Sequence, residues 1–406
     1  MKSSDLIKHL TESGLMPQEE MLEVARGEQS LFIGIPKETA LQENRVPLVP
    51  DSVGLLVNNG HRVIVESNAG AAANFTDKDY SEAGAEIVYE AKQAYKANII
   101  IKVAPPTLDE ISMLDVAQKQ VLFSALQLTA QPKDCIQALM KKKVTGIAYD
   151  FIKDREGLYP IVRSMSEIAG NTSILIAAEL LSNANGGHGV MMGGIPGVKP
   201  TEVVILGAGG VGEFAARSAL GLGANVKIFD DESHRLRRTL NNLGQRVYSS
   251  ILQPKILKKV LKNADVVIGA LRPKNGRTPC VVTEEMVSEM KFGSVIIDVS
   301  IDTGGCFETS QVKSLEDPIY KQYGVTHYCV PNIASRVSRT ASYALSNVFT
   351  PLLLDIGEGG GLQKMMHTQC GIKHGVYMYK GILTSKVLGE TFNLPYKDLD
   401  LLMMAI

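Results

Sequence analysis

A short glycine-rich loop carries the strongest chemical signal in the sequence. Gly207, Gly209 and Gly212 form GxGxxG between an apolar run, VVIL, and a helix-forming run, EFAARSALGL. The first glycine would allow a tight turn, the second would let the backbone approach a pyrophosphate, and the third would let helix and strand pack closely. The next apolar run, NVKIF, ends in Asp230, whose carboxylate would bind adenosine ribose hydroxyls.

This pattern predicts a dinucleotide site, although a purely structural glycine turn also contains such residues. The carboxylate of Asp230 would repel a 2′-phosphate, which favours NAD over NADP. The basic run HRLRR at 234–238 lies close enough in sequence to leave that preference open.

A second acidic residue, Asp302, follows the apolar run SVIIDVS and precedes Thr-Gly-Gly. Ligands of open α/β sheets bind outside the carboxyl ends of the strands, so Asp302 would lie near the nicotinamide half of a dinucleotide. The alternative interpretation is an ordinary turn residue.

The elements that would position these residues alternate along the chain. Short apolar runs and helical stretches alternate from residue 31, a long helix and a glycine-rich loop at 186–200 follow, and a second alternating unit begins at TEVVILG. This alternation is typical of parallel sheets with crossover helices. After about residue 340 the sequence again favours helix, and this last segment most easily packs on the first unit.

We therefore predict an α/β protein with two doubly wound Rossmann-like domains, the first discontinuous, and a cleft between them. Residues 31–160 and 340–406 would form a substrate domain, and residues 161–339 an NAD-binding domain. Residues 1–30 alternate charged and apolar side chains and would form an N-terminal helical extension.

Composition excludes several other classes of protein. The chain has 406 residues, a formal net charge of −1 and no Trp. Neither an excess of basic residues nor a set of stacking Trp side chains therefore indicates nucleic-acid binding. Its five cysteines are widely spaced without CxxC, so neither a disulfide framework nor a metal site is expected. Since no run approaches the roughly 18 apolar residues of a membrane span, we expect a cytoplasmic protein.

Several longer motifs together resemble the alanine dehydrogenase family, which shares its fold with the NAD-binding component of transhydrogenases. The resemblance covers roughly residues 31–400, and the motifs that carry it are IGIPKETALQENRVPLVP, NIIIKVAPP, SMSEIAG, GVMMGGIPGV, the GAGGVG loop, IIDVSIDTGGCFE, YCVPNIASRVSRTASYALSN and YKGILTSKV. It implies NAD-dependent conversion of L-alanine to pyruvate and ammonium, and the reverse. It also implies a homo-oligomer, a hexamer or a dimer.

The resemblance implies roles for individual residues where positions match. Arg45 matches the arginine that binds the substrate carboxylate, Lys102 the lysine that contacts the keto-acid carbonyl or amine, and Asp302 the catalytic aspartate. An apolar surround would depress the pKa of Lys102. The positions that match NAD-binding residues are Ser166, Asp230 and Asn332. Arg45 and Lys102 are also compatible with ordinary surface ion pairs.

The sequence departs from the family at one position. The family has a histidine, the usual acid/base candidate, where this chain has Gln127, at the end of the strand expected within VLFSALQLTA. An amide orients a keto acid by hydrogen bonding but does not titrate near neutral pH, so Gln127 would bind substrate without moving a proton.

Three hypotheses follow from this departure. In the first, an alanine-dehydrogenase-like enzyme redistributes the acid/base work to Asp302, Lys102 or water. In the second, the enzyme is an NAD-linked oxidoreductase that acts on another small amino or 2-oxo acid. In the third, the protein is a catalytically weak NAD-binding relative, or a relative of the transhydrogenase component.

Overall fold

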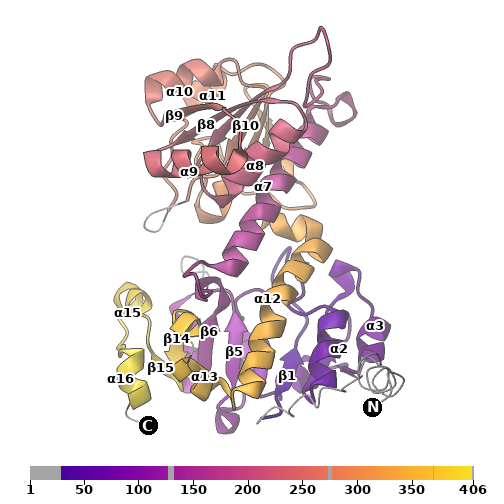
Figure 1. The fold of residues 1–406 in the computed structure, drawn as a ribbon, viewed down its shortest axis with the longest axis vertical. Helices are drawn as coiled ribbons and strands as arrows, with labels where there is room; N and C mark the ends of the chain where they lie inside the picture. The colour runs from indigo at the N-terminus through magenta and orange to yellow at the C-terminus, as the bar shows by residue number, and fades with distance from the viewer. Residues whose placement is uncertain (1–28, 127–131, 273–276, 369, 405–406) are drawn as a thin grey trace, which may run out of the picture.

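The computed structural model describes residues 29–126, 132–272, 277–368 and 370–404. Figure 1 shows two lobes connected by two long helices, α7 (Pro160–Leu181) and α12 (Ser338–Glu358). The predicted helical extension at 1–30 lies almost entirely outside the described residues.

One lobe contains an eight-stranded sheet in the order β15-β14-β6-β5-β4-β1-β2-β3. Neighbours from β6 to β3 run parallel, and β14 and β15 are antiparallel additions at one edge. The strands are β1 (Phe32–Ile35), β2 (Arg62–Glu66), β3 (Glu86–Val88), β4 (Ile99–Ile101), β5 (Val121–Ser124), β6 (Thr145–Ala148), β14 (Val376–Tyr379) and β15 (Ile382–Leu383).

The other lobe contains a seven-stranded sheet in the order β12-β13-β11-β10-β7-β8-β9. It is parallel except for β12, which is antiparallel to β13. The strands are β7 (Glu202–Leu206), β8 (Asn225–Asp230), β9 (Tyr248–Ile251), β10 (Val266–Gly269), β11 (Val295–Asp298), β12 (Ile319–Gln322) and β13 (Val325–Tyr328). The predicted α/β class with two doubly wound sheets is confirmed.

Helices cover both sheets. Besides α7 and α12 they are α2 (Pro50–Asn58), α3 (Asp77–Glu82), α4 (Ala91–Ala94), α5 (Leu108–Ser112), α6 (Lys133–Lys141), α8 (Gly210–Gly221), α9 (Ser233–Leu243), α10 (Pro254–Leu261), α11 (Glu284–Ser288), α13 (Leu362–Thr368), α14 (Cys370–Lys373), α15 (Lys386–Phe392) and α16 (Leu399–Met404). Two 3₁₀ turns matter for the site, η5 (Val299–Thr303) and η6 (Ile333–Val337). Within the described ranges, no helix is both long and apolar enough to cross a membrane.

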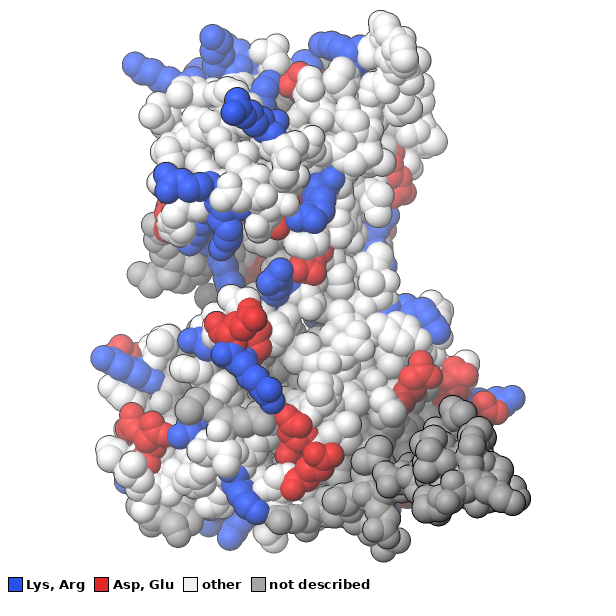
Figure 2. Space-filling model, in the orientation of Figure 1, with Lys and Arg blue, Asp and Glu red and all other residues white. Residues whose placement is uncertain are grey.

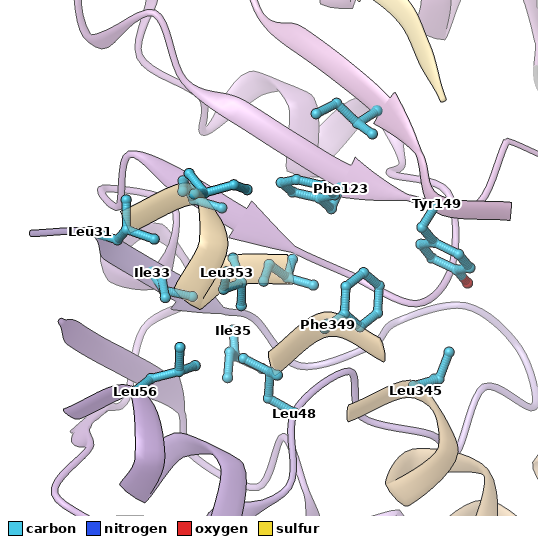
Figure 3. Packing of buried hydrophobic residues seen from close by; sticks show 14 of the residues in the cluster. Leu31, Ile33, Ile35, Leu48, Leu56, Phe123, Tyr149, Leu345, Phe349 and Leu353 are labelled. Carbon is cyan, nitrogen blue, oxygen red and sulfur yellow. The ribbon is translucent and has the colours of Figure 1, made fainter. Parts of the chain in front are cut away.

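The C-terminal part of the chain completes the core of the first lobe. Figure 3 shows Phe349 of α12 beside Phe123 of β5 and Tyr149. Its ring meets both edge to face, with centroid separations of 6.3 and 5.4 Å. Because α12 supplies these buried contacts, the first lobe requires residues from both ends of the sequence, and the predicted discontinuity is confirmed.

The end of the chain differs from the sequence prediction in one element. Residues 376–383 form the β14–β15 hairpin rather than part of a helical segment. Its turn residues, Lys380 and Gly381, both have positive φ angles, 49° and 83°. That combination is typical of a type I′ hairpin turn.

Charged side chains are distributed over both lobes. On the face that Figure 2 shows, Lys and Arg as well as Asp and Glu occur on each lobe. This distribution agrees with the formal net charge of −1.

Candidate active site

The glycine loop between β7 and α8 has the geometry that the sequence predicts. Gly207 has a φ of 115°, and a Cβ there would overlap the backbone of Ala270. A Cβ on Gly212 would overlap the carbonyl oxygen of Gly207, whereas one on Gly209 would meet nothing within 4 Å. The loop is therefore tight and closely packed on one side and open on the other, which fits a pyrophosphate at the start of α8.

Asp230 and Ser166 both lie against this loop. The buried Asp230 carboxylate accepts hydrogen bonds from the backbone N–H groups of Ala208 (2.7 Å) and Glu232 (2.8 Å). Ser166, on α7, is so close to the loop that a Cβ on Gly210 would lie 3.0 Å from its own Cβ. Asp230 thus holds the glycine loop in place.

Arg45 lies in the loop that follows β1 and is paired with Glu43. Its Nε and one terminal nitrogen donate to the two Glu43 carboxylate oxygens at 2.7 and 2.6 Å. Both side chains are largely buried, with exposed fractions of 11% and 5%. Burial alone would lower the pKa of Arg45, but the Glu43 carboxylate outweighs it and raises that pKa. Arg45 is therefore a permanent cation inside the protein.

Asp302 and Asn332 connect this arginine to the second lobe. The Asn332 side-chain amide donates to Glu43 at 3.0 Å, and its backbone N–H donates to Asp302 Oδ1 at 2.8 Å. Dehydration by the surrounding protein raises the pKa of the Asp302 carboxyl, opposed by the Asn332 N–H and the charge of Arg45. Arg45, Glu43, Asn332 and Asp302 form one contact chain from lobe to lobe.

Lys102 directly follows β4, but its surroundings correct the sequence prediction. Its Nζ lies 2.7 Å from Glu110 Oε1 and 3.1 Å from Glu38 Oε2, and all three side chains are buried. Burial alone would lower the pKa of Lys102, but the two carboxylates raise it overall. The expectation of a depressed pKa was therefore wrong, and Lys102 is a protonated hydrogen-bond donor.

The ends of β4 and β5 lie at the same edge of the first sheet. Lys102 N–H donates to the Phe123 carbonyl, and the Tyr149 hydroxyl donates to the Val103 carbonyl at 2.6 Å. Gln127 itself lies outside the described residues. The residue before it, Leu126, is buried, and its N–H donates to Asp150 Oδ1 at 3.1 Å.

A row of buried serines holds the Arg45 loop and was missed from the sequence. The Ser335, Ser342 and Ser346 hydroxyls accept from the backbone N–H groups of residues 44, 46 and 49 at 2.8, 2.9 and 3.1 Å. They come from η6 and α12 at helical spacing, within SRVSRTASYALSN. That spacing was the available signal, because serines repeating on one helix face indicate a buried polar partner.

A cavity of about 440 Å³ opens between the lobes beside this chain. Leu41 and Gln42 line it from the first lobe, and Pro331 and Asn332 are among its second-lobe walls. Asn332 thus lines the cavity and, through Glu43 and Asp302, belongs to the contact chain that reaches Arg45. Lys102 is buried at the end of β4, and the glycine loop lies in the second lobe.

Comparisons with known proteins agree with this arrangement. The model "Alanine dehydrogenase/PNT, N-terminal domain" matches residues 34–169, and "Alanine dehydrogenase/PNT, C-terminal domain" matches residues 173–386. Alanine dehydrogenase 2 of Staphylococcus aureus strain Mu50 is 40% identical over 369 residues, which cover 91% of this chain and 98% of that protein.

Solved structures give the same result. An L-alanine dehydrogenase is 38% identical with a TM-score of 0.82, over 89% of this chain and 99% of that chain. A transhydrogenase from Sinorhizobium meliloti, 24% identical with a TM-score of 0.74 over 87% of this chain and 99% of that chain, shares the fold. The chain belongs to the alanine dehydrogenase/PNT family.

Proposed function

We propose that the protein catalyses the NAD-dependent oxidative deamination of L-alanine to pyruvate and ammonium, and the reverse reaction. The observation that carries the proposal is the contact chain from Arg45 to Asp302, which joins a guanidinium and a titratable carboxyl group through Asn332, a residue that lines the interdomain cavity. The relative that is 40% identical is named an alanine dehydrogenase, which supports this choice of substrate.

We assign residues 31–160 and 340–406 to a substrate domain and residues 161–339 to an NAD-binding domain. The carboxylate of Asp230 beside the glycine loop favours NAD over NADP, because it would repel a 2′-phosphate. We further propose that the enzyme acts in the cytoplasm as a homo-oligomer, a hexamer or a dimer.

Each site residue has one role in this reaction. Arg45 binds the substrate carboxylate, since a guanidinium pairs with it through two parallel hydrogen bonds. A nicotinamide dinucleotide held by the glycine loop and Asp230 would supply the acceptor for the hydride that the substrate Cα loses. The substrate amine is uncharged when the hydride leaves, so an iminium results. Asp302 takes a proton from the water that adds to the iminium carbon and passes it to the nitrogen; the hydroxyl proton returns to Asp302 as ammonia leaves, and becomes the fourth proton of ammonium. Protonated Lys102 donates a hydrogen bond to the oxygen of the carbinolamine and of the 2-oxo acid.

The charges of the candidate site residues and their partners favour a substrate that brings a positive charge. Arg45 and Lys102 contact three carboxyl groups, and Asp302 adds a fourth. When all are ionised, the formal charge is two positive against four negative. The ammonium group of an amino acid and the positive ring of NAD⁺ would both lower this excess, which supports amino-acid oxidation over 2-hydroxy-acid oxidation.

The proposal predicts NADH oxidation when pyruvate and ammonium are added at alkaline pH, with NADPH much poorer. Alkaline pH supplies free ammonia, while the raised pKa of Lys102 keeps that side chain protonated. Absorbance at the NADH band measures the rate, and a panel of other 2-oxo acids serves as the comparison. NADH binding without turnover of any 2-oxo acid would contradict an enzymatic function.

Changing Gln127 to His should raise the rate of pyruvate amination. A histidine titrates near neutral pH, and a positioned acid/base is typically worth about 10²–10⁴-fold, so part of that range is expected. The kcat of Gln127→His measured across pH 6–10 tests this, with Gln127→Asn as the control that adds no titrating group. An unchanged or lower rate would show that Asp302 and Lys102 already complete the acid/base work.

A further inference from the structure

Glu43 holds the guanidinium of Arg45 by one of its two edges. Arg45 Nε donates to Oε1 and one terminal nitrogen donates to Oε2, so the edge formed by Nε and that terminal nitrogen is occupied. The Arg45 backbone N–H also donates to Oε1, at 3.1 Å. These bonds leave the edge formed by the two terminal nitrogens for a second carboxylate.

Among the residues that the structure describes, the remaining terminal nitrogen of Arg45 contacts only a weak hydrogen-bond acceptor. It lies 3.3 Å from the sulfur of Met165, on α7. A thioether is a weak acceptor, so it satisfies this nitrogen less well than a carboxylate would. The orientation that Glu43 imposes therefore leaves the end of the guanidinium available for a strong acceptor.

Glu43 also ties this orientation to the second lobe. Its Oε2 accepts from both Arg45 and the side-chain amide of Asn332, so one oxygen serves a residue from each lobe. Asn332 has a φ of 57°, and its backbone N–H is at the same time bonded to Asp302. A movement of Asn332 or Asp302 would therefore alter the orientation of Arg45 through Glu43.

We infer that Glu43 is a positioning residue for the substrate carboxylate. It holds Arg45 by Nε and one terminal nitrogen, so that the two terminal nitrogens face the substrate carboxylate, and it couples the orientation of Arg45 to Asn332. The inference rests on the proposed function, because the carboxylate is that of pyruvate or alanine. Glu43 does not contact the reacting atoms, so its effect is expected on substrate affinity rather than on the chemical step.

The variant Glu43→Gln tests this role with little change of shape. An amide has one acceptor oxygen, so it cannot accept from both Arg45 nitrogens and from Asn332. We expect the KM for pyruvate to rise about 10–100-fold, the effect of losing a hydrogen bond to a charged group. The kcat at saturating pyruvate should stay within about threefold.

A control variant separates this effect from the general loss of a glutamate–arginine pair at the surface. Glu86 pairs with Arg62 at 2.7 Å on the surface, far from the cavity in the sheet order. Glu86→Gln should leave both KM and kcat unchanged. Glu43→Asp, which keeps two acceptor oxygens, should restore part of the affinity that Glu43→Gln loses.

A double-mutant cycle tests the coupling to Asn332. If Glu43 and Asn332 act through one hydrogen-bond network, the increase in KM of the double variant should be smaller than the product of the increases for Glu43→Gln and Asn332→Ala. Titration of Glu43→Gln with NADH, followed by NADH fluorescence, gives a readout that does not need turnover. Circular dichroism verifies that Asn332→Ala and the double variant are folded, because Asn332 is itself a candidate NAD-binding residue.

Two outcomes distinguish this inference from the proposed function. If the wild-type protein does not turn over pyruvate, the proposed function fails. If the wild type is active and binds NADH, but Glu43→Gln has an unchanged KM, or loses kcat instead of affinity, Glu43 is not a positioning residue. If the increase in KM of the double variant equals the product of the two single increases, Glu43 and Asn332 are not coupled.

Discussion

Replacing Asp302 by Asn is expected to lower kcat for pyruvate amination by about 10²–10⁴-fold, the usual contribution of a positioned acid/base. The asparagine oxygen can still accept the backbone N–H of Asn332, which keeps the local geometry. NADH affinity, measured by fluorescence titration, should therefore change little while the chemical step is lost.

The pH dependence gives a second test of the same residue. Catalysis by an ionised Asp302 declines as pH falls through its pKa, and the raised pKa moves this decline toward neutral pH. The acid limb should disappear in Asp302→Asn. As a control, Asp400→Asn removes a surface carboxylate paired with Lys373 and should keep the wild-type profile. A kcat for Asp302→Asn within about fivefold of the wild-type value would show that a group other than Asp302 is the acid/base.

Replacing Lys102 by Met is expected to destabilise the protein by about 3–5 kcal/mol, the cost of leaving a buried charge without its partner. Two buried carboxylates, those of Glu38 and Glu110, would remain close together with no cation between them. The midpoint of thermal unfolding of the first lobe, followed by circular dichroism, should fall clearly, together with activity.

The chain contains a matched control for this substitution. Lys258 also bridges two glutamates, Glu285 at 2.7 Å and Glu289 at 3.2 Å, but on the surface of the molecule. These side chains are 32% to 72% exposed, and Glu289 also pairs with Lys262 at 3.1 Å, so no carboxylate is left buried without a cation. Lys258→Met should therefore leave the unfolding temperature nearly unchanged. Equal effects of the two substitutions would mean that burial does not control the energy of the Lys102 cluster.

The sequence predicts those features that depend only on residues close together in the chain. The glycine loop is one: Gly207, Gly209 and Gly212 are near neighbours, so their conformations follow from a six-residue motif. The alternation of strands and helices is another, since each strand is a continuous apolar run. The hairpin at 376–383 was missed because VYMY is short and its Lys-Gly turn is a weak signal.

The electrostatics of the site could not be predicted in the same way. The apolar run NIIIKV indicates an apolar surround for Lys102, but Glu38 precedes it by 64 residues in the sequence. Similarly, nothing local to Glu43 indicates Asn332, which lies 289 positions further along the chain. A pKa depends on all nearby charges, so it requires the tertiary structure rather than the neighbouring residues.

The serine row implies an order of assembly during synthesis. The hydroxyl partners of the Arg45 loop are 291–297 positions downstream of the backbone groups that they hold. At roughly 5–20 residues per second, a ribosome adds those residues about 15–60 s after the loop. The second lobe is continuous in sequence, and its last strand, β13, is made before α12 and the β14–β15 hairpin of the first lobe. The second lobe can therefore be complete before the first.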